Sequence, residues 1–359
     1  MKAAVMRNSE LVVDTVPDPT PGPGEVLVKT LACGICGSDL HALKHSHEFV
    51  QSAPQMGAAM DIERDVVMGH EFCAEVLDYG PETSRQLSVG SRVCSFPILL
   101  RDDAPVTIGY SNDIPGGYAE RMVLMEPLLC PVPNGLATES AALTEPMAVG
   151  LHAVEMARMT QEDIPLVIGC GPIGLAVINA LKSKGIGPVV AADYSARRRK
   201  LAELLGADVI IDPAVTSPYS SWLELAQLSR RGEHLPLNPL TGQPELRPGV
   251  FFECVGIPGI IDQMMVGAER GCRFVIVGVC MQPDEIRPLM GISKELSLQF
   301  VLGYTPEEFA QTLHMIAEGE ILTAPLITGS VGVSGVAQAF EDLESPEQHA
   351  KILVEPWRD

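Results

Sequence analysis

The segment 164–212 constrains the fold most, because short apolar runs alternate there with glycine turns and helical stretches. An apolar run at Leu166–Ile168 precedes a glycine-rich turn, an amphipathic helix to about Lys184, a strand at Pro188–Ala192 and another helix. This order predicts right-handed parallel β–α–β winding. Apolar runs at 250–256 and 272–279 fit further buried strands of the same sheet. The expected fold class is therefore α/β with a doubly wound parallel sheet.

The turn after the first strand has the pattern G-x-G-x-x-G, at Gly169, Gly171 and Gly174. The first glycine permits a tight turn, the second lets the backbone approach a pyrophosphate, and the third lets helix and strand pack closely. Pro172 and Ile173 stand in the first turn of the following helix, whose N–H groups are directed at a phosphate. The pattern predicts a dinucleotide site.

Asp193 ends the second strand, about 20 residues beyond the last glycine of the turn. A carboxylate there accepts hydrogen bonds from the adenosine ribose, which favours NAD over a cofactor with a 2′-phosphate. Arg197–Arg199 follow, and two interpretations stay open: a solvated helix face, or a site for a 2′-phosphate. Arg198 alone is expected to pack on the ribose or the adenine.

A second group of reactive side chains lies in the first 150 residues, where short β-rich runs alternate with Pro, Gly and Asp turns. The stretches CGICGSDLH (33–41) and GHEF (69–72) contain Cys36, His70 and Glu71, and LTEP adds Glu145. Thiolate, imidazole and carboxylate are ligands of catalytic zinc, which keeps one position for water or substrate. This mixed set suits zinc better than magnesium or calcium.

Composition argues against several other functions. The chain has 46 acidic and 25 basic residues, and its formal net charge of −21 repels nucleic acid and anionic lipid. No run of about 18 apolar residues occurs, so no membrane span is expected. Nine cysteines cannot all pair, and the N-terminus has no long apolar signal region, so we expect a reduced, cytoplasmic protein.

The motifs CGICGSDLH, GHEF, ALTEP, GCGPIG and ECVG, in this order, resemble the zinc-dependent medium-chain dehydrogenases. This alcohol and polyol dehydrogenase superfamily includes sorbitol, threonine and butanediol dehydrogenases, and the resemblance covers essentially the whole chain. It implies a GroES-like β-rich catalytic domain formed by residues 1–150 and 298–359. A Rossmann domain, residues 151–297, would be inserted between them. It also implies a homodimer or homotetramer that associates through Rossmann edge strands.

The resemblance implies roles for individual residues of the metal site. Cys36 and His70 are expected as zinc ligands. Glu71 and Glu145 are expected at the edge of the metal, where relatives use one or the other. Asp39 is expected to orient His70.

Further roles follow from the same resemblance. Ser38 is expected to bind the substrate oxygen and to pass its proton through the nicotinamide ribose toward His41. Glu71 joins this catalytic set because the resemblance implies that its carboxylate exchanges with water during turnover. Lys351 matches a basic position that reaches the cofactor pyrophosphate in relatives. The residues expected to line the nicotinamide side are Cys254, Val255 and Val277. His45 and His47 are expected in a surface loop.

Three features depart from the family pattern. Many relatives carry a four-cysteine structural zinc lobe, but no cysteine occurs between Cys94 and Cys130, so we expect one zinc per chain. The chain between Cys36 and His70 is long, and its loop 42–68 is expected to border the substrate cleft. An insertion at 216–248 has several prolines and little periodicity, which predicts a partly irregular segment serving as an oligomer contact or a cover on the adenosine side.

Together these features predict reversible oxidation of an alcohol to a ketone or aldehyde, with hydride transfer to NAD. A secondary alcohol, polyol or diol is the expected substrate. Two alternatives stay open. An NADPH-dependent carbonyl reductase would prefer the phosphorylated cofactor despite Asp193. A nucleotide-binding protein of the same fold would lack catalysis. It would have no need for the whole set of Cys36, Ser38, His41, His70 and Glu145.

Overall fold

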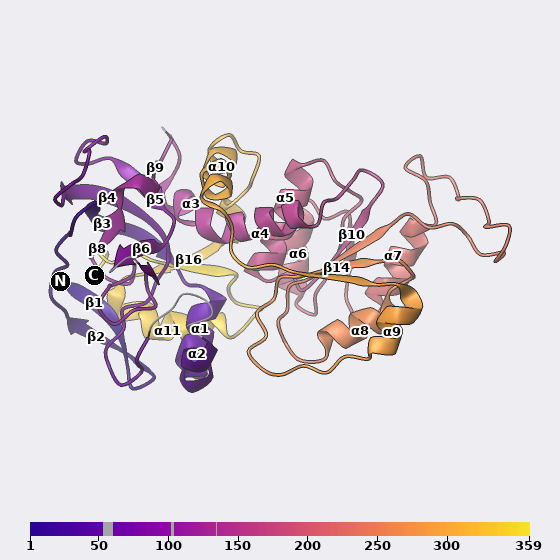
Figure 1. Cartoon of the computed structure of the whole chain (residues 1–359), viewed down its shortest axis with the longest axis horizontal. Helices are drawn as coiled ribbons and strands as arrows, with labels where there is room; N and C mark the ends of the chain where they lie inside the picture. Colours follow the sequence, from indigo (N-terminus) through magenta and orange to yellow (C-terminus); the bar gives the residue numbers. More distant parts are fainter. Residues whose placement is uncertain (53–59, 102–103, 134) are drawn as a thin grey trace. The chain divides into compact units, whose positions relative to one another are not determined.

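The computed structural model describes residues 1–52, 60–101, 104–133 and 135–359, which form two compact units (Figure 1). The first unit contains residues 1–145 and 306–359, and the second contains 146–305. Residues 298–305, expected in the first domain, belong to the second unit, because β15 (Ser297–Phe300) pairs with its sheet. Residues 146–150, also expected in the first domain, lie in the second. The predicted loop 42–68 falls partly outside the described residues.

The second unit is built on a six-stranded parallel sheet in the order β12-β11-β10-β13-β14-β15. Its other strands are β10 (Ile164–Ile168), β11 (Val190–Ala192), β12 (Val209–Ile211), β13 (Gly249–Glu253) and β14 (Arg273–Ile276). Its helices are α5 (Pro172–Ser183), α6 (Ala196–Leu204), α7 (Pro218–Ala226), α8 (Ile260–Gly267) and α9 (Pro288–Lys294). The strand order reverses direction at β10, which confirms the doubly wound sheet and places a ligand crevice at the carboxyl ends of its strands.

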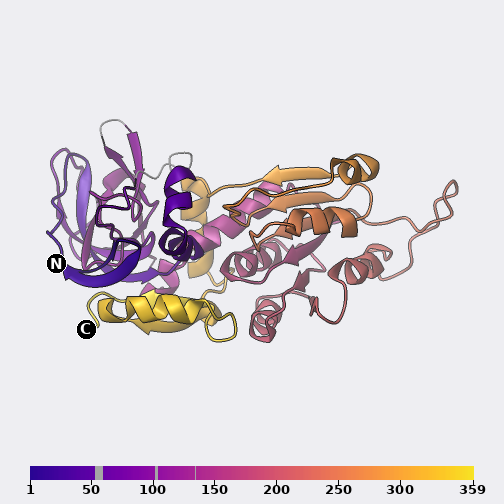
Figure 2. The ribbon, with the colours of Figure 1, turned by 90° about the horizontal axis from the view of Figure 1, so that it is seen from below.

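The insertion at 216–248 divides into two parts. Its first part is α7, whose Trp222 packs edge-on against Phe251 of β13 at 5.1 Å and donates its indole N–H to the Ile164 carbonyl at 3.1 Å. The second part, residues 227–248, contains only isolated bridges and projects from the rest of its unit (Figures 1 and 2). At its tip Leu240 is 94% exposed. The expectation of a partly irregular segment is confirmed, although the buried helix α7 was not anticipated.

The first unit is a β-rich body that contains strands from both ends of the chain. Its main sheet has the order β16-β17-β3-β4-β5-β9, with β8 also paired to β3. The strands are β3 (Glu25–Gly34), β4 (Glu71–Tyr79), β5 (Arg92–Ser95), β8 (Arg121–Met125), β9 (Leu129–Pro131), β16 (Ile327–Val331) and β17 (Lys351–Val354). Two smaller pairs are β1 (Lys2–Arg7) with β2 (Glu10–Thr15), and β6 (Ile98–Arg101) with β7 (Ala104–Thr107). Strand β17 pairs with β3, so the last residues lie beside the start of the metal-site loop.

Short helices connect or cover these strands. They are α1 (Gly37–Lys44), α2 (Ser46–Ser52), α3 (Thr138–Ala142), α10 (Pro306–Ala317) and α11 (Val336–Leu343). The helix α4 (Thr144–Met156) begins in the first unit and continues into the second. Among the described residues, no helix has both the length and the apolar character that a membrane crossing requires.

Candidate metal centre and cofactor site

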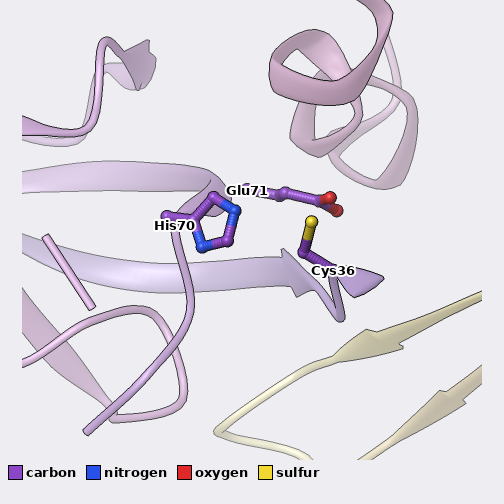
Figure 3. A group of neighbouring side chains, drawn as sticks. All are labelled: Cys36, His70 and Glu71. Atoms are coloured by element: carbon purple, nitrogen blue, oxygen red, sulfur yellow. The ribbon is translucent and has the colours of Figure 1, made fainter. Parts of the chain in front are cut away.

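Strands β3 and β4 bring three predicted metal ligands together (Figure 3). They pair antiparallel with Gly34 opposite Glu71, so the loop after β3 lies beside the start of β4. Cys36 precedes α1, and His70 and Glu71 stand at the beginning of β4. The ligand atoms of these three side chains all lie within 4.8 Å of one another.

Gly69 makes this approach possible. Its φ is +103°, in the left-handed region that favours glycine. A Cβ at this position would meet the Tyr118 ring at 2.8 Å and the Cys33 Sγ at 2.9 Å. Because any side chain here would displace the start of β4, the glycine of the G-H-E motif is required for the placement of His70.

Asp39 is fully buried and is held behind His70 by three donors. Its Oδ2 accepts hydrogen bonds from the Cys36 backbone N–H at 3.0 Å and from the Tyr118 hydroxyl at 2.6 Å, and its Oδ1 accepts from Tyr110 at 2.9 Å. Burial acts to raise the pKa of Asp39, but His70 and these hydrogen bonds outweigh it, so the pKa is lowered. Asp39 is therefore a fixed negative charge inside the protein.

His70 is oriented as a metal ligand. Its buried Nδ1 lies 3.5 Å from Asp39 Oδ1 and makes no hydrogen bond to the described residues. With Nδ1 on the Asp39 side, Nε2 is the nitrogen available to a metal beside the other donors. Burial and the Glu71 charge raise the pKa of the Cys36 thiol, so a thiolate here requires a cation. The His70 Nε2, the Cys36 thiol and the Glu71 carboxylate fit a zinc ion.

Lys351 has a partner different from the one expected. Its side chain is buried, and Nζ lies 2.8 Å from each carboxylate oxygen of Glu71 and 2.9 Å from the Ile35 carbonyl oxygen. Burial acts to lower the pKa of Lys351, but Glu71 and Cys36 outweigh it and raise the pKa. A buried carboxylate needs a compensating charge, and this lysine supplies it from β17 instead of facing a pyrophosphate.

Glu145 lies in the first turn of α4. Its charge also acts to raise the pKa of Lys351. The close group of three ligands does not include it, so its role at the metal remains a prediction.

Ser38 and His41 are both on α1. The Ser38 and Tyr110 hydroxyls are hydrogen-bonded at 2.7 Å, and because the single Tyr110 proton goes to the Asp39 carboxylate, Ser38 Oγ donates to the Tyr110 oxygen. His41 is exposed and its ring stacks on that of His45, with 6.3 Å between centroids. Partial burial of the ring, with repulsion from His45 and Lys44, lowers the pKa of His41.

The glycine-rich turn has the conformation that the sequence predicts. Gly169 has φ +90°, Gly171 caps α5, and Pro172 is in the first turn of that helix. A Cβ on Gly174 would collide with the Gly169 carbonyl oxygen. Asp193 follows β11 and accepts hydrogen bonds from the backbone N–H of residue 170 at 2.8 Å and of residue 195 at 2.7 Å. These contacts hold the carboxylate beside the turn.

The three arginines after Asp193 have different environments. Arg197 is exposed, whereas Arg199 pairs with Asp212 at 2.9 Å and donates to backbone carbonyls. Arg198 lies over Gly171, and one of its terminal nitrogens is 3.9 Å from Asp193 Oδ2. Of these three arginines, only Arg198 adjoins the turn, and its packing on the ribose or the adenine stays a prediction.

The residues expected at the nicotinamide follow two neighbouring strands. Cys254 and Val255 come directly after β13, and Val277 comes directly after β14. Val255 Cγ2 lies against Gly169, so this strand end adjoins the glycine turn. The N–H groups of Val255 and Gly256 donate to the Glu253 carboxylate, which fixes the loop.

Two site residues escaped the sequence analysis. Tyr110 and Tyr118 both donate to Asp39, and the Tyr110 ring lies 5.2 Å from that of His70. Tyr118 lies in the segment GGYAE (116–120), 79 residues from Asp39 in sequence. No local pattern marks Tyr110, because it is 71 residues from Asp39 in sequence.

Comparisons with known proteins agree with this architecture. A family model described as an alcohol dehydrogenase GroES-like domain matches residues 22–134, and one described as a zinc-binding dehydrogenase matches residues 172–318. An (R,R)-butanediol dehydrogenase of Neisseria gonorrhoeae is 30% identical, over 99% of both chains. A sorbitol dehydrogenase of Bos taurus is 30% identical, over 95% of this chain and 94% of the relative. The crystal structure of 2R,3R-butanediol dehydrogenase from Bacillus subtilis superposes with a TM-score of 0.80, at 30% identity over 99% of both chains.

A parallel dinucleotide-type sheet joined to a β-rich unit with a cysteine, histidine and carboxylate cluster defines a metal-dependent dehydrogenase. The chain belongs to the zinc-dependent medium-chain alcohol and polyol dehydrogenases. It is a zinc-dependent oxidoreductase that acts on small alcohols, polyols or diols and uses a nicotinamide cofactor.

Proposed function

We propose that this enzyme oxidises a secondary alcohol, a polyol or a vicinal diol to a carbonyl compound, with NAD as hydride acceptor and one zinc per chain. The buried cluster of Cys36, His70 and Glu71 carries this proposal. The names of the similar butanediol and sorbitol dehydrogenases support the substrate class. The missing cysteines between Cys94 and Cys130 support a single zinc.

Each residue of the site has a defined task in this reaction. Zinc, when bound by Cys36, His70 and one of the two carboxylates, supplies Lewis-acid chemistry that makes a hydroxyl more acidic. Asp39 holds His70 in place. Ser38 would accept the substrate hydroxyl proton, and His41 would receive a proton at the end of the relay. A bound nicotinamide would supply the hydride acceptor.

The test combines metal analysis with a panel of polyols, diols and hydroxy acids. We expect one zinc per chain, NADH formation with vicinal diols or polyols, and loss of turnover after chelation that added zinc restores. Ser38→Ala should lower kcat by about 100-fold, the usual contribution of a positioned proton-transfer group, without loss of zinc. Turnover that survives complete zinc removal would contradict the proposal.

The preference for NAD rests on Asp193, whose charge lies beside the turn and would repel a 2′-phosphate. We expect kcat/KM with NAD to exceed that with NADP by about 100-fold. Asp193→Asn should lower the ratio of kcat/KM with NAD to kcat/KM with NADP. The alternative, an NADPH-dependent carbonyl reductase, is favoured by Arg198, whose buried Nε has no partner among the described residues. A preference for NADP in the unaltered enzyme would support it.

We propose that the enzyme is a homodimer or homotetramer that associates through β15, an end strand of the parallel sheet. Large apolar side chains are exposed on β15 and in the segments beside it: Leu289, Ile292, Phe300 and Leu302. Such a patch is typical of an interface between subunits. Light scattering should give a dimer or tetramer for the unaltered chain and smaller species for Phe300→Lys.

We propose a cytoplasmic location. The nine cysteines are all free thiols, and Cys36 must stay reduced to serve as a metal ligand. Alkylation of protein that is rapidly denatured on release from cells should modify all nine cysteine thiols. Cysteines that resist alkylation because they are oxidised would contradict a reducing compartment.

A further inference from the structure

Glu253 is a buried carboxylate at the carboxyl end of β13. It is the last residue of that strand and is 2% exposed. The strand order of the parallel sheet reverses at β10, so β11 and Asp193 lie on one side, and β13 and β14 lie on the other. A dinucleotide binds across such a reversal, with one half on each side. In the proposed function the adenosine half lies beside Asp193, so the nicotinamide half belongs at the ends of β13 and β14.

The Glu253 side chain fixes the loop 254–256, which follows β13. Its Oε1 accepts hydrogen bonds from the backbone N–H groups of Val255 at 2.6 Å and of Gly256 at 2.8 Å. Gly256 has φ +71°, in the left-handed region, so the chain turns sharply at this residue. The carboxylate and the turn together hold the loop in one conformation.

The main chain of Glu253 fixes the loop 277–279, which follows β14. The N–H groups of Val277 and Gly278 both donate to the Glu253 carbonyl oxygen at 2.9 Å. The two loops also pack directly on each other at their glycines. A Cβ on Gly278 would collide with the Gly256 backbone nitrogen and would lie 2.6 Å from Glu253 Oε2. The carboxylate therefore fills the junction between the loops, and a side chain at position 278 would push them apart.

The chemistry of the junction requires an acceptor and not only a filler. Burial raises the pKa of Glu253, and the backbone N–H groups of both loops only partly offset this effect. An apolar side chain would avoid the cost of burying a carboxylate, but it would leave the loop N–H groups buried without an acceptor. The carboxylate therefore gives the backbone of the loops a fixed direction, which an apolar side chain would not.

We infer that Glu253 is a positioning residue that holds loops 254–256 and 277–279 in the arrangement that receives the nicotinamide ring. This inference rests on the proposed function, because it takes NAD as the cofactor and Asp193 as the partner of its adenosine half. The carboxylate is buried and engaged by the loop N–H groups, so Glu253 acts through the backbone of the loops and not by contact with the ring.

The experiment compares the binding of NADH and of ADP-ribose to the full-length enzyme and to its Glu253→Gln variant. ADP-ribose has every part of the cofactor except the nicotinamide ring. Glutamine keeps the size of the side chain and one acceptor oxygen, but it removes the charge and places an amide NH2 group near the loop donors. We expect the Kd of NADH to rise about tenfold, as for the weakening of a charged hydrogen bond, and the Kd of ADP-ribose to change by less than about twofold.

Gly278→Ala tests the same junction from the other loop. Its methyl group would separate the two loops, so we expect the same selective loss of NADH affinity. The double variant Glu253→Gln, Gly278→Ala should lose less affinity than the product of the two single effects, because both substitutions disturb one contact.

Asp163→Asn is the matched control. Asp163 is also 2% exposed and accepts a backbone N–H, from Thr160 at 2.6 Å, but it precedes β10 at the opposite end of the sheet. We expect a lower thermal midpoint for this variant and unchanged Kd values for both ligands. The thermal midpoint is measured without ligand for every variant, which separates lost stability from lost binding.

The outcomes separate this inference from the proposed function. If the unaltered enzyme binds neither NADH nor ADP-ribose, the proposed cofactor fails and this inference fails with it. If it binds both but Glu253→Gln leaves the Kd of NADH unchanged, only the inference is overturned. Equal losses of NADH and ADP-ribose affinity would also overturn it, because Glu253 would then act on the whole cofactor site. If Glu253→Gln does not fold, Gly278→Ala decides the question by the same two Kd values.

Discussion

Lys351 has a large influence on the charge of the metal centre. It is the ammonium partner of buried Glu71, and both side chains are almost completely shielded from solvent. In an empty site this ion pair balances the carboxylate, and the same carboxylate is a candidate metal ligand. The Lys351 ammonium therefore competes with a metal cation for Glu71, so metal binding is coupled to the Lys351–Glu71 ion pair.

We predict that Lys351→Met destabilises the metal-free protein by about 3 kcal/mol, because it leaves Glu71 buried without a counter-charge. Urea unfolding measures the change. The double variant Lys351→Met, Glu71→Gln should recover most of the loss, since no charge is then left unpaired. A single variant as stable as the unaltered protein would show that the carboxylate is neutral or solvated.

His41 gives a prediction on pH dependence. The pKa of His41 is lowered by partial burial and by the neighbouring His45 and Lys44. The ring therefore stays neutral at pH values somewhat below 6.5, the usual pKa of histidine. A neutral ring accepts a proton and a protonated ring does not. The rate of alcohol oxidation should therefore hold down to pH 6.5 and fall as the pH drops through the lowered pKa. His41→Gln should remove this inflection from the kcat profile, and an unchanged profile would exclude His41 from proton transfer.

The turn between β10 and α5 shows how one element combines packing with binding. Gly174 packs directly against the backbone of Gly169, because a Cβ on Gly174 would collide with the Gly169 carbonyl oxygen. Gly171 has φ −67°, and the nearest atoms to a Cβ there belong to Arg198, at 3.9 Å. Gly174 is therefore required for the packing of the fold, and Gly171 is required for binding of the ligand.

We predict opposite consequences for two alanine variants of this turn. Gly174→Ala should destabilise the protein by about 2 kcal/mol, because helix and strand must separate. Gly171→Ala should change stability by less than about 1 kcal/mol but weaken NADH binding at least about tenfold, since its methyl stands where the pyrophosphate approaches. Thermal unfolding without cofactor and NADH fluorescence titration measure the two effects. Equal NADH affinity in Gly171→Ala would place the pyrophosphate elsewhere.

In the whole molecule, the two units differ in how the chain forms them. The parallel sheet lies entirely within residues 146–305, whereas the β-rich unit needs β17 from the C-terminus beside β3. Cutting the chain at 305 would remove both that strand and Lys351.

We predict that residues 146–305 expressed alone fold, bind NADH and hold no zinc. Circular dichroism, NADH fluorescence and metal analysis test this. Residues 1–305, which lack β16 and β17, should lose zinc affinity because Glu71 loses its counter-charge and β3 loses a neighbour. Zinc bound by the isolated middle segment would contradict the assignment of the metal centre.

The sequence by itself determined the features that depend on neighbours along the chain. The β–α–β segment and the glycine turn follow from periodicity and from backbone freedom at a few adjacent residues. The candidate metal ligands Cys36, His70 and Glu71 follow from residue type and motif. The predicted end of the parallel-sheet domain at residue 297 was wrong, however, because the second unit continues to residue 305. The pairing of β15 depends on β14 and not on local propensity.

Only the tertiary structure decided the contacts between distant residues. Lys351 and Glu71 are 280 residues apart, and Ser38 and Tyr110 are 72 apart. No local pattern connects such pairs, because a buried charge takes whichever partner the strand order brings near. Sequence motifs identify the reactive groups, but the topology of the β-rich unit determines which lysine balances the carboxylate and which tyrosine contacts the serine.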